Sequence, residues 1–184
     1  QLNVGYVDAP VSGGTKGAEE ASLAIMAGGS PQDFATVKIV LNALGRPVHV
    51  GPLGAGQLAK LANQAIVAVT IAAVAEAMLM LQNGGADPAA VRVALKGGFA
   101  DSTILQQHGA RMTTGDFTPG GLCELQLKDL NNALAEAESF GLSLPTLINT
   151  RDRFQRLVSD LNGAKLDHSA LYLELCDLNG LGSV

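Results

Sequence analysis

An apolar run at residues 57–82 is the most distinctive pattern in the chain. From Gln57 to Gln82 only Lys60 and Glu76 carry charge, and most other residues are Ala, Val, Ile, Leu and Met. This composition predicts one long helix, and a helix that is apolar on nearly every side is expected to be buried on nearly every side. The run is preceded by three glycines, at 51, 54 and 56, which break any regular structure before it.

Shorter helical patterns follow the long one, and each is bounded by glycine, by proline or by a capping side chain. Asp87-Pro88 and Ser102 are signals for a helix start, and Gly141 and Gly163 are signals for a helix end. Helices are expected over residues 88–96, 103–111, 123–140, 145–161 and 168–178. Residues 54–180 therefore predict an all-helical bundle around the long helix.

The first fifty residues have a different pattern, in which short apolar segments alternate with turns and one helix. Strands are expected over residues 4–8, 23–27 and 47–50, and a helix is expected over residues 31–44. This order is typical of the end of an α/β sheet rather than of a complete domain. The predicted fold class is mainly α, with a partial α/β segment at residues 1–52 and an all-helical domain at residues 53–184.

Composition and charge exclude several functional classes. Apolar residues make up 47% of the chain, charged residues 16%, and the net charge is −5. Because the basic residues are few and scattered, we expect no nucleic-acid partner. The most apolar part of the long helix, residues 61–75, is shorter than a membrane span, and no signal-peptide pattern follows Gln1. We therefore expect no membrane partner and a cytoplasmic location.

The cysteines and histidines show no metal-binding spacing. Cys123 and Cys176 are far apart and are expected to be free thiols of a reducing compartment. His49, His108 and His168 are isolated from one another in the sequence, with no carboxylate cluster beside them. From this pattern we expect no metal site.

Lys60 is the first candidate for chemistry. A cation in the first turns of an apolar helix is costly unless neighbouring groups offset it. Helical spacing places Lys60, Asn63 and Gln64 on one face, so two amides can hold the ammonium while the helix N-terminus attracts an anion. The pattern predicts a proton donor beside an anion site, although a lysine that extends its ammonium into water has the same spacing.

The segment Ser12-Gly13-Gly14 is the second candidate, since it follows the first strand and contains only small residues. Successive backbone N–H groups in such a turn can form a concavity that binds anions. An ordinary Gly-Gly loop is the alternative interpretation of the same residues.

Three motifs together resemble the β-hydroxyacid dehydrogenase family. They are Asp8-Ala-Pro-Val-Ser-Gly-Gly14, Gly54-x-Gly56-x-x-x-Lys60-x-x-Asn63 and Lys128-Asp129-Leu130. The likeness covers essentially the whole chain. It is greatest to family members that act on tartronate semialdehyde, through Lys60-Leu-Ala-Asn-Gln64, residues 97–103 and residues 167–170.

The resemblance implies NAD or NADP as the cofactor and a Rossmann-like domain for its binding. Residues 1–52 would be the terminal part of that domain, because the Gly-x-Gly-x-x-Gly fingerprint of its first turn is not found in this sequence. We therefore expect the 184 residues of this sequence alone to show no tight binding of the cofactor and no turnover.

The family also implies a role for each candidate. Lys60 would be the general acid, Asn63 and Gln64 would orient the substrate, and Lys128 would reach the nicotinamide side of the cofactor. The substrate carboxylate would be bound by Ser12, Gly13 and Gly14. Many relatives have Asn four residues after the lysine, where this chain has Gln64, so either amide fits the orienting role. Lys128 can also be interpreted as an exposed helical lysine.

Two further positions are interpreted through the same resemblance. Gly121 stands where relatives often have a bulky aromatic residue, and Asp167 and His168 are interpreted as the start of a helix rather than as catalysts.

The expected reaction is hydride transfer between NAD(P)H and a small carboxylate semialdehyde, with tartronate semialdehyde going to D-glycerate. The alternatives within the family are 3-hydroxyisobutyrate and succinic or glyoxylic semialdehyde. A different class, a non-catalytic helical oligomerisation module, would also account for the apolar helix. In either class we expect a homo-oligomer, either a dimer or a tetramer.

Overall fold

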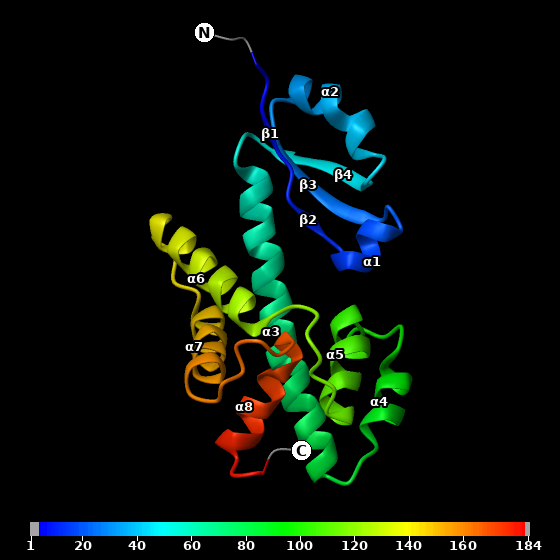
Figure 1. Ribbon diagram of the computed structural model, residues 1–184, viewed down its shortest axis with the longest axis vertical. Helices are drawn as coiled ribbons and strands as arrows, with labels where there is room; N and C mark the ends of the chain where they lie inside the picture. The colour runs from blue at the N-terminus through cyan, green and yellow to red at the C-terminus, as the bar shows by residue number, and fades with distance from the viewer. Residues whose placement is uncertain (1–3, 183–184) are drawn as a thin grey trace. The chain divides into compact units, whose positions relative to one another are not determined.

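The computed structural model describes residues 4–182 and confirms a mainly helical chain with a small sheet (Figure 1). The chain forms two compact units, one ending at Asn63 and the other beginning at Gln64. The first unit holds the sheet and the second holds most of the helices.

The sheet of the first unit is organised around strand β3 (Leu23–Gly29), whose Ile25 and Ala27 side chains are buried. The short strands β1 (Val7–Asp8) and β2 (Val11–Ser12) pair antiparallel with one edge of β3, and β4 (Gly45–Gly51) pairs with it in parallel. The register joins Asp8 to Gly28 and Ser12 to Ala24. β3 is therefore the central strand of a mixed sheet.

Two elements of this unit were not predicted. Strand β2 continues the chain past Pro10, and residues expected to form only a turn begin the six-residue helix α1 (Gly14–Glu19). Both elements are too short to leave a periodic pattern in the sequence. Helix α2 (Pro31–Leu41) begins as predicted, with the Ser30 hydroxyl accepting from the Asp33 N–H at 3.0 Å, but it ends three residues before Leu44.

The first turn of helix α3 (Ala55–Asn83) is fixed by a carboxylate from β1. The two oxygens of Asp8 accept the backbone N–H groups of Gly54 at 2.8 Å and of Gln57 at 2.7 Å. These donors have no partner within the helix, and an anion there also interacts favourably with the helix dipole. Asp8 is 8% exposed, so water competes little for these bonds.

The same turn packs directly on the strand backbone, and glycines make this approach possible. A Cβ on Gly56 would lie 2.5 Å from the carbonyl oxygen of Met26, and one on Gly28 would lie 2.7 Å from the Gly56 nitrogen. Side chains cannot occupy such distances, so the contact requires glycine at both positions. Gly56, which was expected to break the structure before the long helix, instead lies in the first turn of α3 and allows its close packing.

Helix α3 is buried along one side only. Ala68, Ile71 and Met78 are fully buried, whereas Ile66 is 66% and Met80 is 69% exposed. The expectation of burial on nearly every side is therefore wrong for the chain by itself. The helix therefore has apolar side chains on an exposed face.

By length and composition α3 is also able to cross a membrane, so the prediction from residues 61–75 was too restrictive. Its most apolar window has a mean hydropathy of 2.0, and 33% of that window is buried inside the chain. The core helices of soluble proteins have the same length and composition, so this property does not by itself assign a membrane.

The second unit packs its helices around the C-terminal part of α3 (Figure 1). The predicted helices begin at the expected residues and end within three residues of the expected ends, and the one expected over residues 168–178 is divided into a 3-10 helix and an α-helix. They are α4 (Pro88–Leu95), α5 (Thr103–Thr114), α6 (Cys123–Ser139), α7 (Pro145–Ser159), the 3-10 helix η1 (His168–Ala170) and α8 (Leu171–Leu178). The core includes Met112, Leu130, Phe154 and Tyr172, all fully buried.

An ion-pair network joins three helices of this unit. The carboxylate of Glu174 on α8 is 2% exposed and is 2.9 Å from Arg153 Nε and 3.0 Å from Arg156 Nη1, both on α7. Arg153 also reaches Glu76 on α3 at 3.0 Å. The buried carboxylate is therefore neutralised by two guanidinium groups, as a buried charge requires.

We predict that Asp8→Asn lowers the free energy of unfolding by about 1–3 kcal/mol, because an amide NH₂ would face one of the two helix N–H groups. Urea unfolding of the two proteins measures the difference. Asp87→Asn is the matched control: Asp87 caps α4 at an exposed position, where Asn caps equally well. Equal, small effects of both substitutions would contradict the structural role of Asp8.

Candidate active site

Lys60 and Asn63 lie on the α3 segment whose start is fixed by Asp8. Lys60 is one helical turn beyond Gln57, the last residue bonded to the Asp8 carboxylate. Lys60 and Asn63 are both half-buried, and their spacing of three places them on one face of the helix. The structure thus keeps Lys60 partly shielded from water at a short distance from a rigid helix start.

The segment Ser12-Gly13-Gly14 joins β2 to α1. Ser12 ends the strand and is half-buried, while Gly13 and Gly14 have φ angles of 139° and 63°, in the region that favours glycine. The first helical hydrogen bond runs from the Gly17 N–H to the Gly13 carbonyl, at 3.0 Å. The N–H groups before Gly17 therefore have no partner within α1, which is the feature that an anion-binding turn needs.

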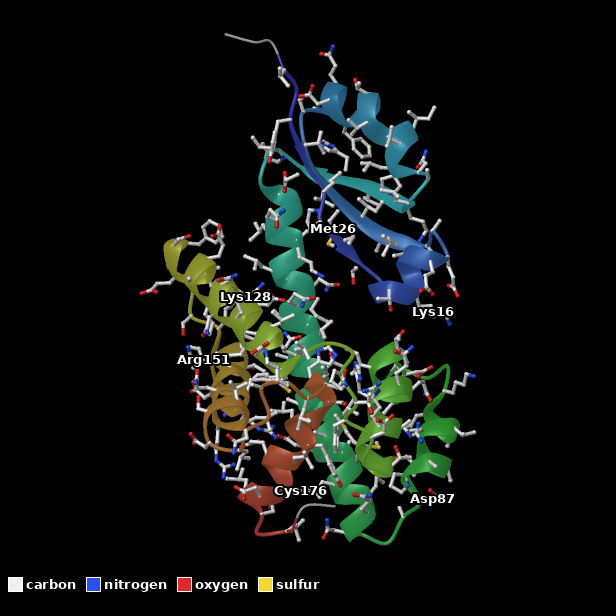
Figure 2. The ribbon with its side chains drawn as sticks, in the orientation of Figure 1. Lys16, Met26, Asp87, Lys128, Arg151 and Cys176 are labelled. Atoms are coloured by element: carbon white, nitrogen blue, oxygen red, sulfur yellow. The ribbon has the colours of Figure 1, made fainter. Side chains whose placement is uncertain are left out.

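In the helical unit, Asp129 lies between two of the predicted site residues. Gln64 Nε2 donates to Asp129 Oδ2 at 2.7 Å, and Lys128 Nζ is 3.1 Å from Asp129 Oδ1. Lys128 is on α6 (Figure 2), and its side chain is 61% exposed. The family resemblance gave Asp129 no role of its own, and its place in the Lys-Asp-Leu motif was the available signal.

Two histidines that are far apart in the sequence lie against each other in the structure. His168 Nε2 is 3.1 Å from His108 Nε2, and the ring planes are inclined by 84° with centroids 4.7 Å apart. His168 Nδ1 is 3.2 Å from Gln126 Oε1. Sixty residues separate the two histidines, so no local pattern could have joined them.

Asp167 holds this cluster in place, and the prediction that it starts a helix is confirmed. Its Oδ1 accepts the Ser169 N–H at 3.0 Å as the N-cap of η1, and its Oδ2 accepts the Gly121 N–H at 3.0 Å. Arg111 Nη1 is 3.4 Å from Oδ1 and balances its charge. Asp167 is therefore mainly a structural carboxylate.

Burial controls the ionisation of this cluster. Burial lowers the pKa of His168 to about 4 and, as the largest effect, also lowers the pKa of His108. For Asp167, burial opposes ionisation, but hydrogen bonds from Ser169 and Gly121 outweigh it and the pKa is lowered. Burial raises the pKa of Cys123 to about 12, so this thiol is unreactive. Near neutral pH the cluster contains two neutral imidazoles and one carboxylate.

Gly121 makes room for the His168 imidazole. A Cβ at this position would lie 3.0 Å from Cε1 of the ring and 3.2 Å from each ring nitrogen. A larger residue at 121 would therefore require the imidazole to shift by a few tenths of an ångström.

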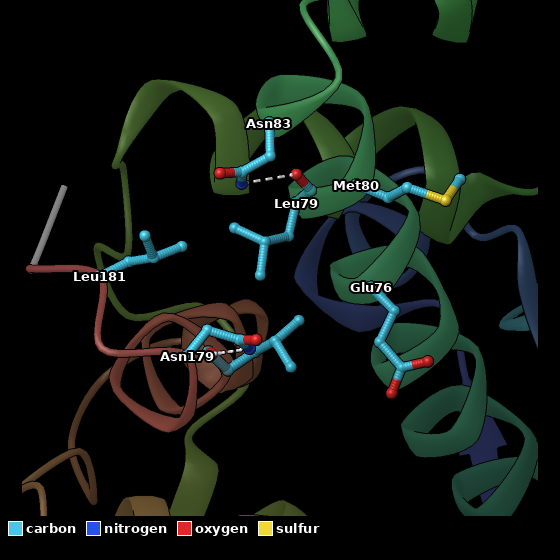
Figure 3. Close-up of a pocket in the computed structure, with 7 residues that line it drawn as sticks. Glu76, Leu79, Met80, Asn83, Asn179 and Leu181 are labelled. Carbon is cyan, nitrogen blue, oxygen red and sulfur yellow. Dashed lines mark hydrogen bonds between the residues drawn. The ribbon is translucent and has the colours of Figure 1, made fainter.

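Two cavities in the helical unit contain none of the predicted site residues. One, of about 420 Å³, lies between α3 and the C-terminal segment, and Figure 3 shows Asn83 and Asn179 at its edge with their amides bonded to backbone carbonyls. The other, of about 400 Å³, is apolar and lies between α3 and the start of α7. Neither brings together groups that suit catalysis.

Two known protein families match this chain, and the two matched segments share residue 54. The family described as "NAD-binding of NADP-dependent 3-hydroxyisobutyrate dehydrogenase" matches residues 54–175. The "NAD binding domain of 6-phosphogluconate dehydrogenase" matches residues 1–54. Both matches therefore concern nicotinamide-dinucleotide enzymes.

Individual relatives agree with these families. The chain is 47% identical to 2-hydroxy-3-oxopropionate reductase of Escherichia coli over 172 residues, which are 93% of this chain and 59% of that protein. The structure of 3-hydroxyisobutyrate dehydrogenase from Mycobacterium tuberculosis with L-serine superposes with a TM-score of 0.82 at 30% identity, covering 92% of this chain and 60% of that one. The corresponding Salmonella typhimurium enzyme gives 0.83 at 29% identity, covering 94% and 61%. The chain thus spans about three fifths of the length of these relatives.

Proposed function

The chain belongs to the β-hydroxyacid dehydrogenase family, and on this basis we propose that the complete protein transfers hydride between NAD or NADP and a small carboxylate semialdehyde. The observation that carries the proposal is Lys60, a half-buried cation one turn beyond the helix start that Asp8 fixes. We further propose that residues 1–52 are the terminal part of the dinucleotide-binding domain and that residues 53–184 are the helical domain. The boundary between the two family matches, at residue 54, supports this division.

Lys60 is the general acid in this proposal. The bound nicotinamide cofactor supplies the hydride, and charge develops on the carbonyl oxygen of the substrate as the aldehyde is reduced. The Lys60 ammonium donates its proton to that oxygen and stabilises its charge in the transition state. In the reverse direction the neutral amine takes the hydroxyl proton.

The substrate carboxylate is assigned to Ser12, Gly13 and Gly14. The positive φ angles of both glycines and the helix start that follows them support this role, since they leave backbone N–H groups for an anion. Each carboxylate oxygen can accept one such N–H or the Ser12 hydroxyl.

The two amides are assigned different roles. The bond from Gln64 Nε2 to Asp129 supports a role for Gln64 in holding Asp129. We therefore assign the orientation of the substrate to Asn63, which shares a helix face with Lys60.

Lys128 is assigned to the cofactor. Its exposed ammonium, held by Asp129, suits the amide and phosphate oxygens of a nicotinamide dinucleotide. The Lys128 ammonium therefore fits a nicotinamide dinucleotide. The Gly-x-Gly-x-x-Gly fingerprint that would bind the pyrophosphate is not found in this sequence.

Tartronate semialdehyde, reduced to D-glycerate, is the proposed substrate. The 47% identity to the Escherichia coli 2-hydroxy-3-oxopropionate reductase supports it. The likeness to 3-hydroxyisobutyrate dehydrogenases supports 3-hydroxyisobutyrate as the alternative, with succinic or glyoxylic semialdehyde after it.

We predict that Lys60→Ala lowers kcat of the complete enzyme by about 10²–10⁴-fold, because the proton donor is lost while the carboxylate site is retained. Steady-state kinetics should show the loss in kcat with a much smaller change in KM. Lys38→Ala is the control, since Lys38 is an exposed lysine of α2. Turnover of Lys60→Ala within a few-fold of wild type would show that another group donates the proton.

For the substrate, we predict that kcat/KM is at least ten-fold higher for tartronate semialdehyde than for succinic semialdehyde, and that oxidation of D-glycerate is favoured over that of 3-hydroxyisobutyrate. A site that binds a substrate hydroxyl discriminates strongly against analogues that lack it. Parallel assays give the ratios, with NADH and NADPH for the reduction of the semialdehydes and with NAD⁺ and NADP⁺ for the oxidation of the hydroxyacids. A preference for 3-hydroxyisobutyrate would contradict the assignment of tartronate semialdehyde and support 3-hydroxyisobutyrate as the substrate.

The complete protein is also proposed to be a homo-oligomer through the exposed face of α3. Ile66 and the apolar cavity that it lines support this, since exposed apolar patches mark association sites. We predict a dimer or larger species in light scattering, shifted toward monomer by Ile66→Asp. Val93→Asp, at a 73% exposed position of α4, is the control that leaves the assembly unchanged. A wild-type monomer at high concentration would contradict the assignment.

A further inference from the structure

His168 is held in one tautomer by its neighbours. Gln126 Nε2 donates to the Gln64 carbonyl at 3.2 Å, which fixes the amide so that its Oε1 faces His168 Nδ1 at 3.2 Å. An amide oxygen only accepts, so Nδ1 carries the proton. In the neutral ring the Nε2 lone pair is then directed toward His108.

The two imidazole nitrogens have the spacing of ligands on one ion. Ligands at 2.0–2.1 Å from a tetrahedral Zn²⁺ lie about 3.3 Å apart, and the Nε2 atoms of His108 and His168 lie 3.1 Å apart. The ring centroids are 4.7 Å apart. If the two rings pointed their Nε2 atoms straight at each other, the same distance between these atoms would place the centroids further apart. The two lone pairs are therefore inclined to each other, as convergence on one ion requires.

His108 has an unsatisfied nitrogen that a metal ion would explain. Its Nδ1 is buried and has no hydrogen-bond partner among residues 4–182, and it lies 3.7 Å from Asp167 Oδ1. If His108 donates Nε2–H to His168, its neutral Nδ1 lone pair faces a carboxylate, which is unfavourable. With Nε2 on a metal, Nδ1 instead carries a proton that faces Asp167, an arrangement typical of metal-bound histidines.

We propose that His108 and His168 bind a divalent transition-metal ion through their Nε2 atoms, with Asp167 orienting His108 and Gln126 orienting His168. One atom from each of His108, Asp167 and His168 lies within 4.8 Å of the others. Asp167 stays outside the coordination sphere because Ser169, Gly121 and Arg111 already engage its oxygens. Water completes the coordination, and the His108 side chain, 15% exposed, gives access.

Imidazole ligands select Zn²⁺, Cu²⁺ and Ni²⁺ over the oxygen-seeking Mg²⁺ and Ca²⁺. The site is independent of hydride transfer, since none of its residues is assigned to substrate or cofactor. Occupancy would clamp α5 to η1 and so stabilise the helical unit.

The test is a calorimetric titration of the complete, chelator-treated protein with Zn²⁺ at pH 7.5. We expect saturable binding that weakens roughly ten-fold or more in His108→Gln and in His168→Gln. His49→Gln is the matched control and should bind as wild type, because His49 belongs to the first unit and bonds to the Gly29 carbonyl. Circular dichroism verifies that each variant is folded.

A second measurement reads the ligands directly. With Cu²⁺, electron paramagnetic resonance should show two imidazole nitrogens on the ion in the wild type and fewer in His108→Gln and His168→Gln. This difference is expected even if a variant is destabilised, provided that it is still folded. If no saturable binding is seen up to about 1 mM Zn²⁺, any affinity is very weak and the proposal is overturned. Binding or a nitrogen signal that both variants retain would also overturn it.

Discussion

The Asp8 carboxylate is the constraint on which the first unit depends. It joins the edge strand β1 to the first turn of α3 through two charge-assisted bonds, in a place where water competes little. Gly28 and Gly56 permit the backbone approach that these bonds need, because a Cβ at either position would overlap neighbouring backbone atoms. The orientation of the helix segment that carries Lys60 is therefore fixed by one carboxylate and two glycines.

The helices could be predicted because their signals are local. Asp87, Ser102 and Asp167 cap the helices that they were expected to cap, since a capping side chain acts within three residues of itself. Strand β2 and helix α1 were missed because two and six residues leave no period to detect. The one-sided burial of α3 was also missed, since composition reports how apolar a helix is but not what covers it.

The candidate site likewise has features that follow from local sequence and features that depend on contacts between distant residues. The common face of Lys60 and Asn63 follows from helical spacing and could be predicted from sequence. The cap from Asp8 to Gln57 spans 49 residues, the Gln64–Asp129 bond spans 65 and the His108–His168 contact spans 60, so each required the folded chain. The roles of Ser12, Gly13, Gly14 and Lys128 stay predictions that rest on the family. Gly121 has a neighbour in the structure that the sequence did not indicate, since the His168 ring lies beside it.

Protonation of the substrate oxygen by Lys60 can be tested with a crystal structure of the complete enzyme that contains oxidised cofactor and D-glycerate. We expect Lys60 Nζ to lie within about 2.6–3.2 Å of the hydroxyl oxygen that would exchange the proton. A different side chain at that distance, with the Lys60 ammonium in bulk solvent, would contradict it.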